Sequence, residues 1–335
     1  MALAGVAHAA DAPAPSQPSL ELFAVGDWGI DSPDRQKVAD AMATYATAEP
    51  AHKPQDVLLL GDNFYINLTG VDDPRIHQFF DLTYDAKKLD VPFYAVLGNH
   101  DYKGDNASIE MKWASQGKSR FTLPSRWYRL ELPAEHPVVS VFMLDSDQPY
   151  MPNGMWDQET QWLKTELAKP HAPWVICCAH HDMFGNGSHG DNGVLQTTWG
   201  PLFKEYHVPF YICGHEHTLQ HLEIPGWPIS FVIAGGGGAA RKPMLRDLRG
   251  PFSRASLGFA AMTFTPDVAT ISLIDGDDQV VHEFTRSADG AVKILMNTPS
   301  DKATKHPLRV LQGIDAPSDQ VGGPTTLPTK KVFGD

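Results

Sequence analysis

Seven short apolar runs recur along the chain, and stretches of mixed apolar and polar residues separate them. The runs are rich in β-branched and aromatic residues, a pattern that favours buried strands. They are ELFAVG (21–26), DVLLLG (56–61), VPFYAVLG (91–98), VVSVFMLD (138–145), PWVICCA (173–179), VPFYICG (208–214) and ISFVIAGGGG (229–238). Because helix-like stretches lie between the runs, the pattern predicts strands crossed over by helices, which is an α/β sheet protein.

Four of the separating stretches predict helices, each with an apolar stripe that can lie on a sheet. The first has a start signal, with Ser32 as the cap and Pro33 in the first turn. The predicted ranges are 32–49, 73–89, 155–169 and 197–207.

Residues 257–286 differ from this pattern, because they carry no helix signal and alternate with turn residues. They predict antiparallel strands added to the same body. Residues 288–335 are polar and rich in Pro, Lys and Thr, which predicts a weakly ordered tail. We therefore expect one folded domain over residues 20–287, between tails at 1–19 and 288–335.

The size and charge of the chain exclude some function classes. It has 335 residues, 42% of them hydrophobic, and a formal net charge of −13. The length allows a full core, and the negative charge argues against a scaffold that binds nucleic acid by neutralising phosphates. No run approaches the roughly 20 apolar residues of a membrane-spanning helix. Cys177, Cys178 and Cys213 lie in strand-like runs and are expected to be buried free thiols of a monomeric protein.

The first residues are Ala-rich and weakly apolar. Ala7, His8 and Ala9 form an A-x-A cleavage pattern, but the basic segment of a signal peptide is missing. Residues 1–19 are therefore interpreted either as the remnant of an export signal or as an ordinary disordered tail. The first interpretation predicts a periplasmic or secreted protein.

Polar residues follow five of the seven apolar runs. The exits are GDWG with Asp27, GDNFY with Asp62, Asn63 and Tyr65, GNHD with Asn99, His100 and Asp101, AHHD with His180 and His181, and GHEH with His215 and His217. A single Gly-Asp after a strand is most often a turn or a helix cap, and paired histidines can be surface residues. In an open α/β sheet, however, the carboxyl ends of the strands face one crevice. The joint occurrence therefore predicts a metal site, since carboxylate, amide and imidazole groups together suit a hard or borderline cation.

The ordered set GDWG, GDNFY, GNHD, a His-containing strand end and GHEH resembles the calcineurin-like metallophosphoesterases, and among them the purple acid phosphatases, particularly the tartrate-resistant type. The resemblance spans about Leu20 to Arg286. It implies a four-layer αββα sandwich with two mixed sheets, and a catalytic domain over residues 20–287.

The resemblance also implies a set of metal ligands. Asp27, Asp62, Tyr65 and His217 would hold a ferric ion, and Asp62 would bridge to a divalent Fe, Zn or Mn ion completed by Asn99, His180 and His215. Tyr65 favours Fe(III), because a phenol with an ordinary pKa of about 10 becomes a phenolate near neutrality only beside a strong Lewis acid.

Four further residues follow from the same alignment of motifs. In AHHD the first histidine, His180, matches the ligand of the family, and His181 stands where a Tyr often occurs. His100 and His189 are expected to stabilise developing charge and to protonate the leaving group. Asp101 is expected to hold the tautomer of His100.

The implied activity is hydrolysis of phosphate monoesters by a metal-bound hydroxide, that is, an acid phosphatase acting on a small-molecule phosphate ester or a phosphoprotein. A phosphodiesterase or nucleotide hydrolase on the same centre is the alternative. A third hypothesis, a metal-binding protein without turnover, is disfavoured by the presence of both His100 and His189.

Overall fold

The structure of the chain is a computed structural model that describes residues 19–241, 243–244 and 249–302. The A-x-A pattern at residues 7–9 lies outside the described residues, as does most of the predicted tail at 288–335. The export signal and the location that it implies therefore stay predictions.

An eight-stranded mixed sheet contains the N-terminal strands. Its spatial order is β15-β14-β13-β12-β1-β2-β3-β4. The strands are β1 Leu20–Val25, β2 Asp56–Leu59, β3 Phe93–Ala95, β4 Phe121–Thr122, β12 Gly258–Phe264, β13 Val268–Asp275, β14 Val280–Ser287 and β15 Val292–Asn297. Strands β1 to β4 run parallel, whereas β12 pairs antiparallel with β1 and β13 to β15 continue the antiparallel order. The carboxyl ends of β1, β2 and β3 therefore meet at one edge of this sheet.

A seven-stranded mixed sheet contains the middle of the chain, in the order β11-β9-β10-β8-β7-β6-β5. The strands are β5 Tyr128–Leu132, β6 Val139–Met143, β7 Trp174–Cys178, β8 Phe210–Cys213, β9 Leu219–Glu223, β10 Ser230–Ala234 and β11 Phe252–Arg254. Strands β6, β7, β8 and β10 are parallel, and β5, β9 and β11 pair antiparallel with their neighbours. The parallel set again brings several carboxyl ends to one edge.

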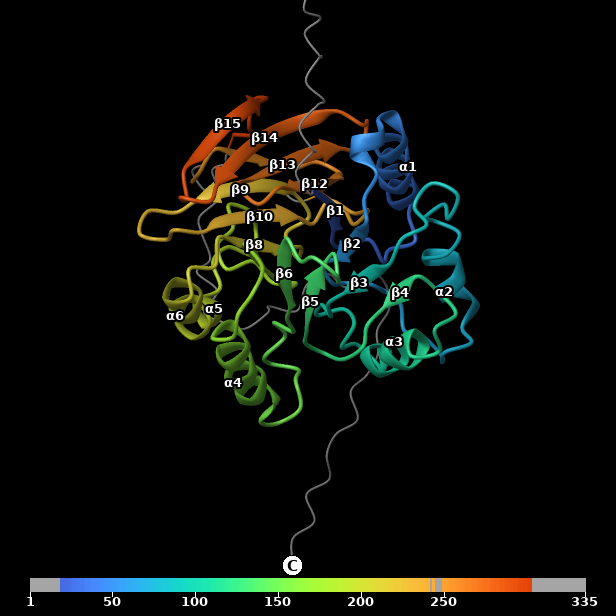
Figure 1. The fold of residues 1–335 in the computed structure, drawn as a ribbon. Helices are drawn as coiled ribbons and strands as arrows, with labels where there is room; N and C mark the ends of the chain where they lie inside the picture. The colour runs from blue at the N-terminus through green and yellow to red at the C-terminus, as the bar shows by residue number, and fades with distance from the viewer. Residues whose placement is uncertain (1–18, 242, 245–248, 303–335) are drawn as a thin grey trace, which may run out of the picture.

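The two sheets lie between two groups of helices, α1 to α3 on one side and α4 to α6 on the other (Figure 1). The helices are α1 Pro33–Ala48, α2 Pro74–Phe79, α3 Asn106–Ala114, α4 Met155–Leu167, α5 Gly193–Thr198 and α6 Gly200–Glu205, with a 3-10 turn η1 at Pro50–His52. Successive residues of β7 show the layers, because Ile176 packs in the core shared with the first sheet and Cys177 packs with Leu163 of α4. This arrangement confirms the predicted αββα architecture.

Helix α1 begins as predicted, since the Ser32 hydroxyl accepts the Arg35 N–H and Pro33 opens the helix. Two other predicted helices are wrong in extent. Residues 73–89 form only the short α2 and then turns, in which Phe80 and Tyr84 pack on Trp28. The predicted helix 197–207 covers only the end of α5 and the whole of α6, and the two helices are separate because Pro201 lacks the N–H that would continue the hydrogen-bond ladder.

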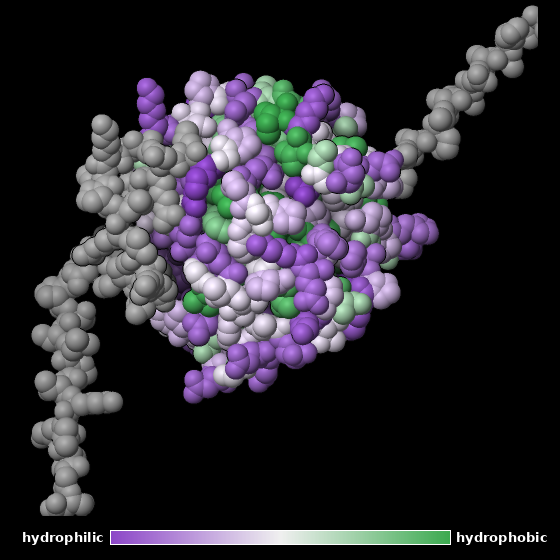
Figure 2. Space-filling model, turned by 90° about the vertical axis from the view of Figure 1, so that its left-hand side faces the viewer, coloured by the Kyte–Doolittle hydropathy of each residue, from purple (hydrophilic) through white to green (hydrophobic). Residues whose placement is uncertain are grey.

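Some elements were not predicted from the sequence. Helix α3 and strands β4, β5, β9 and β11 had no assignment, and β15 lies in the range interpreted as a C-terminal tail. Strand β15 is an edge strand whose Ile294, Leu295 and Met296 are exposed. On the face shown in Figure 2, hydrophobic residues gather near the top, and a mixture of hydrophilic and intermediate residues with a few scattered hydrophobic ones covers most of the rest.

Candidate metal centre

The polar strand ends of both sheets meet at one place. Asp27, Asp62 and Asn99 follow β1, β2 and β3 of the first sheet, and His180 and His215 follow β7 and β8 of the second. Ligand atoms of Asp27, Asp62 and His180 lie within 4.8 Å of one another. Parallel order brings Asp27 and Asp62 to one edge of the first sheet, and the packing of the second sheet against the first brings His180 beside them.

The backbone at the strand ends adopts unusual conformations. Asp27, Asp62 and His215 have φ angles of 60°, 52° and 64°, in the left-handed region that non-glycine residues seldom occupy. Such strain costs about 1–3 kcal/mol at each residue and persists where the surroundings demand it, which is typical of functional sites. Gly98 is required for a different reason, because a Cβ there would lie 2.4 Å from Asp62 Oδ1 and 2.9 Å from His180 Cγ.

One group of donors surrounds Tyr65. Its hydroxyl lies 3.1 Å from Asp27 Oδ1 and 3.1 Å from His217 Nε2. His217 Nε2 is also 3.3 Å from Asp27 Oδ1, so phenol, carboxylate and imidazole form one compact triangle. These are three of the four residues expected to hold the ferric ion, and the structure brings them together.

The second group surrounds His180. His180 Nε2 is 3.1 Å from Asn99 Oδ1, 3.1 Å from His215 Nδ1 and 3.4 Å from Asp62 Oδ1. The four residues expected to hold the divalent ion are therefore also together. Asp27 connects the two groups, because its Oδ2 accepts the backbone N–H of His215 at 2.8 Å.

Carbonyl groups determine which ring nitrogens face the centre. His180 Nδ1 lies 2.9 Å from the Leu60 carbonyl, and His217 Nδ1 lies 2.7 Å from the Ala240 carbonyl. A carbonyl only accepts, so each Nδ1 carries the proton and leaves the Nε2 lone pair directed at the centre. This is the usual support of a metal-binding imidazole.

Electrostatics at the centre favour positive charge. Burial would lower the pKa of His180, but the Asp62 and Asp27 carboxylates outweigh it and raise the pKa to about 9. Burial would raise the pKa of Asp27, but contact with His217 holds it below its ordinary value. Burial and the same two carboxylates raise the pKa of Tyr65 well above its ordinary value, so only a strong cation would produce the phenolate.

The donor set fits two cations of different character. His180 Nε2 and His215 Nδ1 face each other at 3.1 Å, and the oxygens of Asn99 and Asp62 lie beside them. Carboxylate, amide and imidazole donors suit a borderline divalent ion, and the phenol distinguishes the Tyr65 group as the harder site. The residues present therefore fit the binuclear centre that the sequence predicts.

His100 lies at the rim of the centre. Its backbone N–H donates to Asp62 Oδ1 at 2.8 Å, and its ring packs on Tyr65 with centroids 4.0 Å apart. The ring is partly exposed, and the Lys103 ammonium lies beside it. His100 can therefore reach a group bound at the centre without being one of the proposed ligands.

Asp101 does not make the contact expected from the sequence. Its carboxylate is fully buried and accepts the backbone N–H groups of Gly98, Asn63 and Phe64 at 2.8, 3.1 and 2.9 Å. Among the described residues, none of its hydrogen bonds goes to the His100 ring. The buried amides of two loops need an acceptor more than the exposed imidazole does, so Asp101 joins the GNHD and GDNFY loops.

His189 lies on the other side, where its ring stacks on His215 with centroids 3.9 Å apart. Glu216 holds this loop, because its carboxylate accepts the N–H groups of Ser188 and His189 at 2.9 and 2.7 Å. His181 differs from His180, since its Nδ1 contacts the Ser146 hydroxyl at 2.9 Å. The structure thus directs the two adjacent histidines to different surroundings.

Two supporting residues, Glu110 and Lys103, were not recognised from the sequence, and Asn63 was noted there only as a polar residue of the GDNFY exit. Asn63 donates to Glu110 on α3 at 3.0 Å and to Asp101 at 3.2 Å, so a buried acid of an unpredicted helix helps to hold the loops. Burial and the Asp101 charge raise the pKa of Glu110 well above its ordinary value. An acidic residue within a mixed stretch such as NASIEMKWA gives no signal of burial, which explains why Glu110 was missed.

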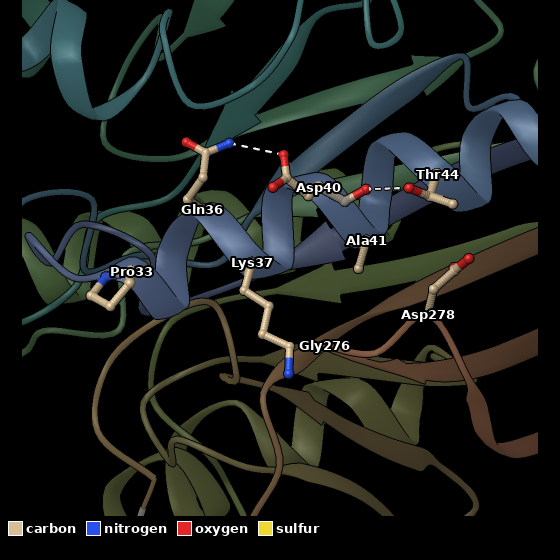
Figure 3. A pocket seen from close by; sticks show the side chains of 8 residues that line it. All are labelled: Pro33, Gln36, Lys37, Asp40, Ala41, Thr44, Gly276 and Asp278. Atoms are coloured by element: carbon tan, nitrogen blue, oxygen red, sulfur yellow. Dashed lines mark hydrogen bonds between the residues drawn. The ribbon is translucent and has the colours of Figure 1, made fainter.

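A separate pocket of about 460 Å³ lies between α1 and the turn at residues 276–278 (Figure 3). Its polar lining includes Gln36, Lys37 and Asp40, and the Lys37 ammonium pairs with Asp277 at 2.6 Å. The residues that line it include none of the predicted metal ligands.

In the described part of the chain, no helix is long and apolar enough to span a membrane.

The sequence is similar to known phosphatases. The family model of calcineurin-like phosphoesterases matches residues 21–219. Tartrate-resistant acid phosphatase type 5 of Mus musculus is 32% identical over 244 residues, which cover 66% of this chain and 73% of the relative. Purple acid phosphatase 17 of Arabidopsis thaliana is 29% identical over 303 residues, which cover 82% of this chain and 86% of the relative.

Solved structures share the fold at lower sequence identity. Purple acid phosphatase PPD1 from yellow lupin seeds superposes with a TM-score of 0.65 at 16% identity, covering 86% of this chain and 58% of that chain. GAP50, described as the anchor in the inner membrane complex of Plasmodium, superposes with a TM-score of 0.68 at 19% identity, covering 86% and 91%. These likenesses concern the fold, whereas the sequence matches concern the family. The chain belongs to the calcineurin-like phosphoesterases, is similar in sequence to purple acid phosphatases, and is a metal-dependent phosphate ester hydrolase.

Proposed function

We propose that the protein hydrolyses phosphate monoesters at a binuclear centre in which Fe(III) is paired with a divalent Fe, Zn or Mn ion. The observation that carries the proposal is the contact of the Tyr65 hydroxyl with both Asp27 and His217 at 3.1 Å, because a phenol donor distinguishes one half of the centre from the other. The proposed ligands are Asp27, Asp62, Tyr65 and His217 for Fe(III), with Asp62, Asn99, His180 and His215 for the divalent ion.

When bound, the two ions would polarise the phosphoryl oxygens and activate water as the nucleophile. The protein residues supply orientation and proton transfer. Asn99 adds a neutral oxygen, which limits the negative charge that an approaching phosphate meets. His100 and His189 approach the centre from two different loops, and we expect them to donate hydrogen bonds to phosphoryl oxygens and a proton to the leaving group.

The substrate is proposed to be a small phosphate ester or a phosphoprotein. Two partly exposed histidines at the rim support this proposal, because a substrate side chain can remain outside while its phosphate enters. Monomeric state and a periplasmic or secreted location remain predictions from the sequence.

The test compares p-nitrophenyl phosphate, a monoester, with bis(p-nitrophenyl) phosphate, a diester, on one preparation with measured metal content. We expect a clear preference for the monoester in kcat/KM and two metal ions per chain. Preference for the diester would replace the proposal with a phosphodiesterase on the same centre. A fully metallated protein that cleaves neither ester would contradict both activities.

A further inference from the structure

Lys103 lies against His100 at the rim of the candidate centre. Its Nζ is 3.1 Å from Nδ1 and 3.2 Å from Nε2 of the His100 ring, so the ammonium is almost equally distant from both nitrogens. The Lys103 side chain is exposed. The sequence motif GNHD ends before this residue, and the predicted site therefore did not include it.

The backbone holds these two side chains together. The Lys103 N–H donates to the His100 carbonyl at 3.0 Å, which closes a turn, and Gly104 follows with a φ of 67°. The Ala107 N–H then donates to the Asp101 carbonyl at 2.7 Å at the start of α3. Because the turn is anchored through Asp101 to the GDNFY loop, Lys103 is held near the centre by more than its own flexible stem.

Charge makes this position unusual. The chain carries a formal net charge of −13, yet in the described residues Lys103 forms no ion pair with a carboxylate. Its nearest polar partner is instead an imidazole, which can itself donate to an anion. The Lys103 ammonium and the N–H of the His100 ring are two neighbouring donors at the rim, and one anionic oxygen could accept from both.

We propose that Lys103 is a substrate-binding residue that, together with His100, holds the phosphoryl group of a phosphate monoester. The inference rests on the proposed function and adds a preference within it. A monoester carries one more ionisable oxygen than a diester, so a second cationic donor at the rim favours the monoester. Lys103 binds either the phosphoryl oxygen that His100 contacts or the adjacent phosphoryl oxygen. This contact lowers KM more than it raises kcat.

The experiment compares wild type, Lys103→Gln and Lys103→Arg in metallated protein. Lys112→Gln on α3 is the matched control, because this lysine is also exposed and contacts neither His100 nor a proposed ligand among the described residues. We expect Lys103→Gln to raise KM for p-nitrophenyl phosphate and the inhibition constant of inorganic phosphate about tenfold, the usual effect of losing a charged hydrogen bond. The diester should change less, and Lys103→Arg should retain most of the affinity.

Direct binding of inorganic phosphate, measured by calorimetry on the same variants, separates this inference from the proposed function. If wild type cleaves neither ester, the proposed function fails, while weaker phosphate binding by Lys103→Gln would still support the role of Lys103. If wild type is active and Lys103→Gln binds phosphate within twofold of wild type, the role of Lys103 is refuted. An equal loss in Lys112→Gln would likewise refute it, because the effect would then come from net charge.

Discussion

At the scale of single residues, the two rim histidines separate a catalytic role from a packing role. We expect His100→Ala and His189→Ala each to retain both metals and to lower kcat, since general acid help is typically worth about 10²- to 10⁴-fold. The loss should be smaller for an aryl phosphate than for an alkyl phosphate, because a phenoxide leaves with little protonation. Kinetics with both substrates and metal analysis measure this. Loss of metal, or equal small losses for both substrates, would contradict the assignment.

The residue scale also shows which side chains can be identified without a structure. Asp27 and Asp62 were found because each directly follows an apolar run, where a strand must end, whereas Tyr65 was found through the family resemblance of the GDNFY motif. Lys103 could not be found in this way. Its contact with His100 depends on a turn closed by one backbone hydrogen bond, and residue spacing does not reveal that turn.

At the scale of elements, the GNHD and GDNFY loops are joined through Asp101. Asp101→Asn should weaken the link between the two loops. Three backbone N–H groups donate to the two oxygens of the Asp101 carboxylate, and an amide offers only one oxygen acceptor. We expect a loss of about 1–3 kcal/mol of stability and weaker retention of metal, with kcat per bound metal pair nearly unchanged. Thermal unfolding and metal analysis test this. Unchanged stability and metal content with a lower kcat would instead favour the originally expected role in orienting His100.

Strands β9 and β14 are linked by a buried pair of histidines. His221 Nδ1 lies 2.9 Å from His282 Nε2, and His282 Nδ1 lies 3.1 Å from Asn297 Oδ1 on β15. Burial and the neighbouring His221 lower the pKa of His282 to about 4. The unfolded chain, with an ordinary pKa of about 6.5, then binds the proton first. The contribution of neutral His282 to the free energy of unfolding is therefore fully present above pH 6.5, and it is lost as the pH falls towards 4.

We expect His282→Gln to reduce the pH dependence of the free energy of unfolding. The reduction should be about 2 kcal/mol between pH 6.5 and 4, after allowance for partial screening by water. Denaturant unfolding at several pH values measures the slope. His136→Gln, at an exposed position between β5 and β6, is the control and should leave the slope as in wild type. A slope in His282→Gln equal to that of wild type would show that the pair does not contribute to acid sensitivity.

The elements show where pattern reasoning succeeds and where it fails. Long apolar runs such as residues 173–179 predicted their strands, because burial on both faces leaves no polar position. The half-exposed strand β5, YRLEL, was missed since its polar residues Arg129 and Glu131 pair with each other on the surface. The helix predicted over residues 73–89 was too long, because the aromatic residues after α2 pack inward from turns.

At the scale of the whole molecule, the site exists because two mixed sheets pack on one shared core and the carboxyl ends of their parallel strands meet at one place. Phe264 of the first sheet packs on Phe210 and Trp174 of the second, so the sheets are held face to face. The first sheet contributes Asp27, Asp62 and Asn99, and the second contributes the histidines. The α/β class could be predicted from alternating strands and helices, whereas the pairing of two separate sheets came only with the family resemblance.

The most direct test of the proposed centre is the visible spectrum of the purified, active protein together with its metal content. We predict one iron and a second metal ion per chain, and a phenolate-to-Fe(III) charge-transfer band that disappears in Tyr65→Phe while the fold is retained. A colourless protein that contains only zinc and hydrolyses phosphate monoesters at the full rate would contradict the Fe(III) assignment.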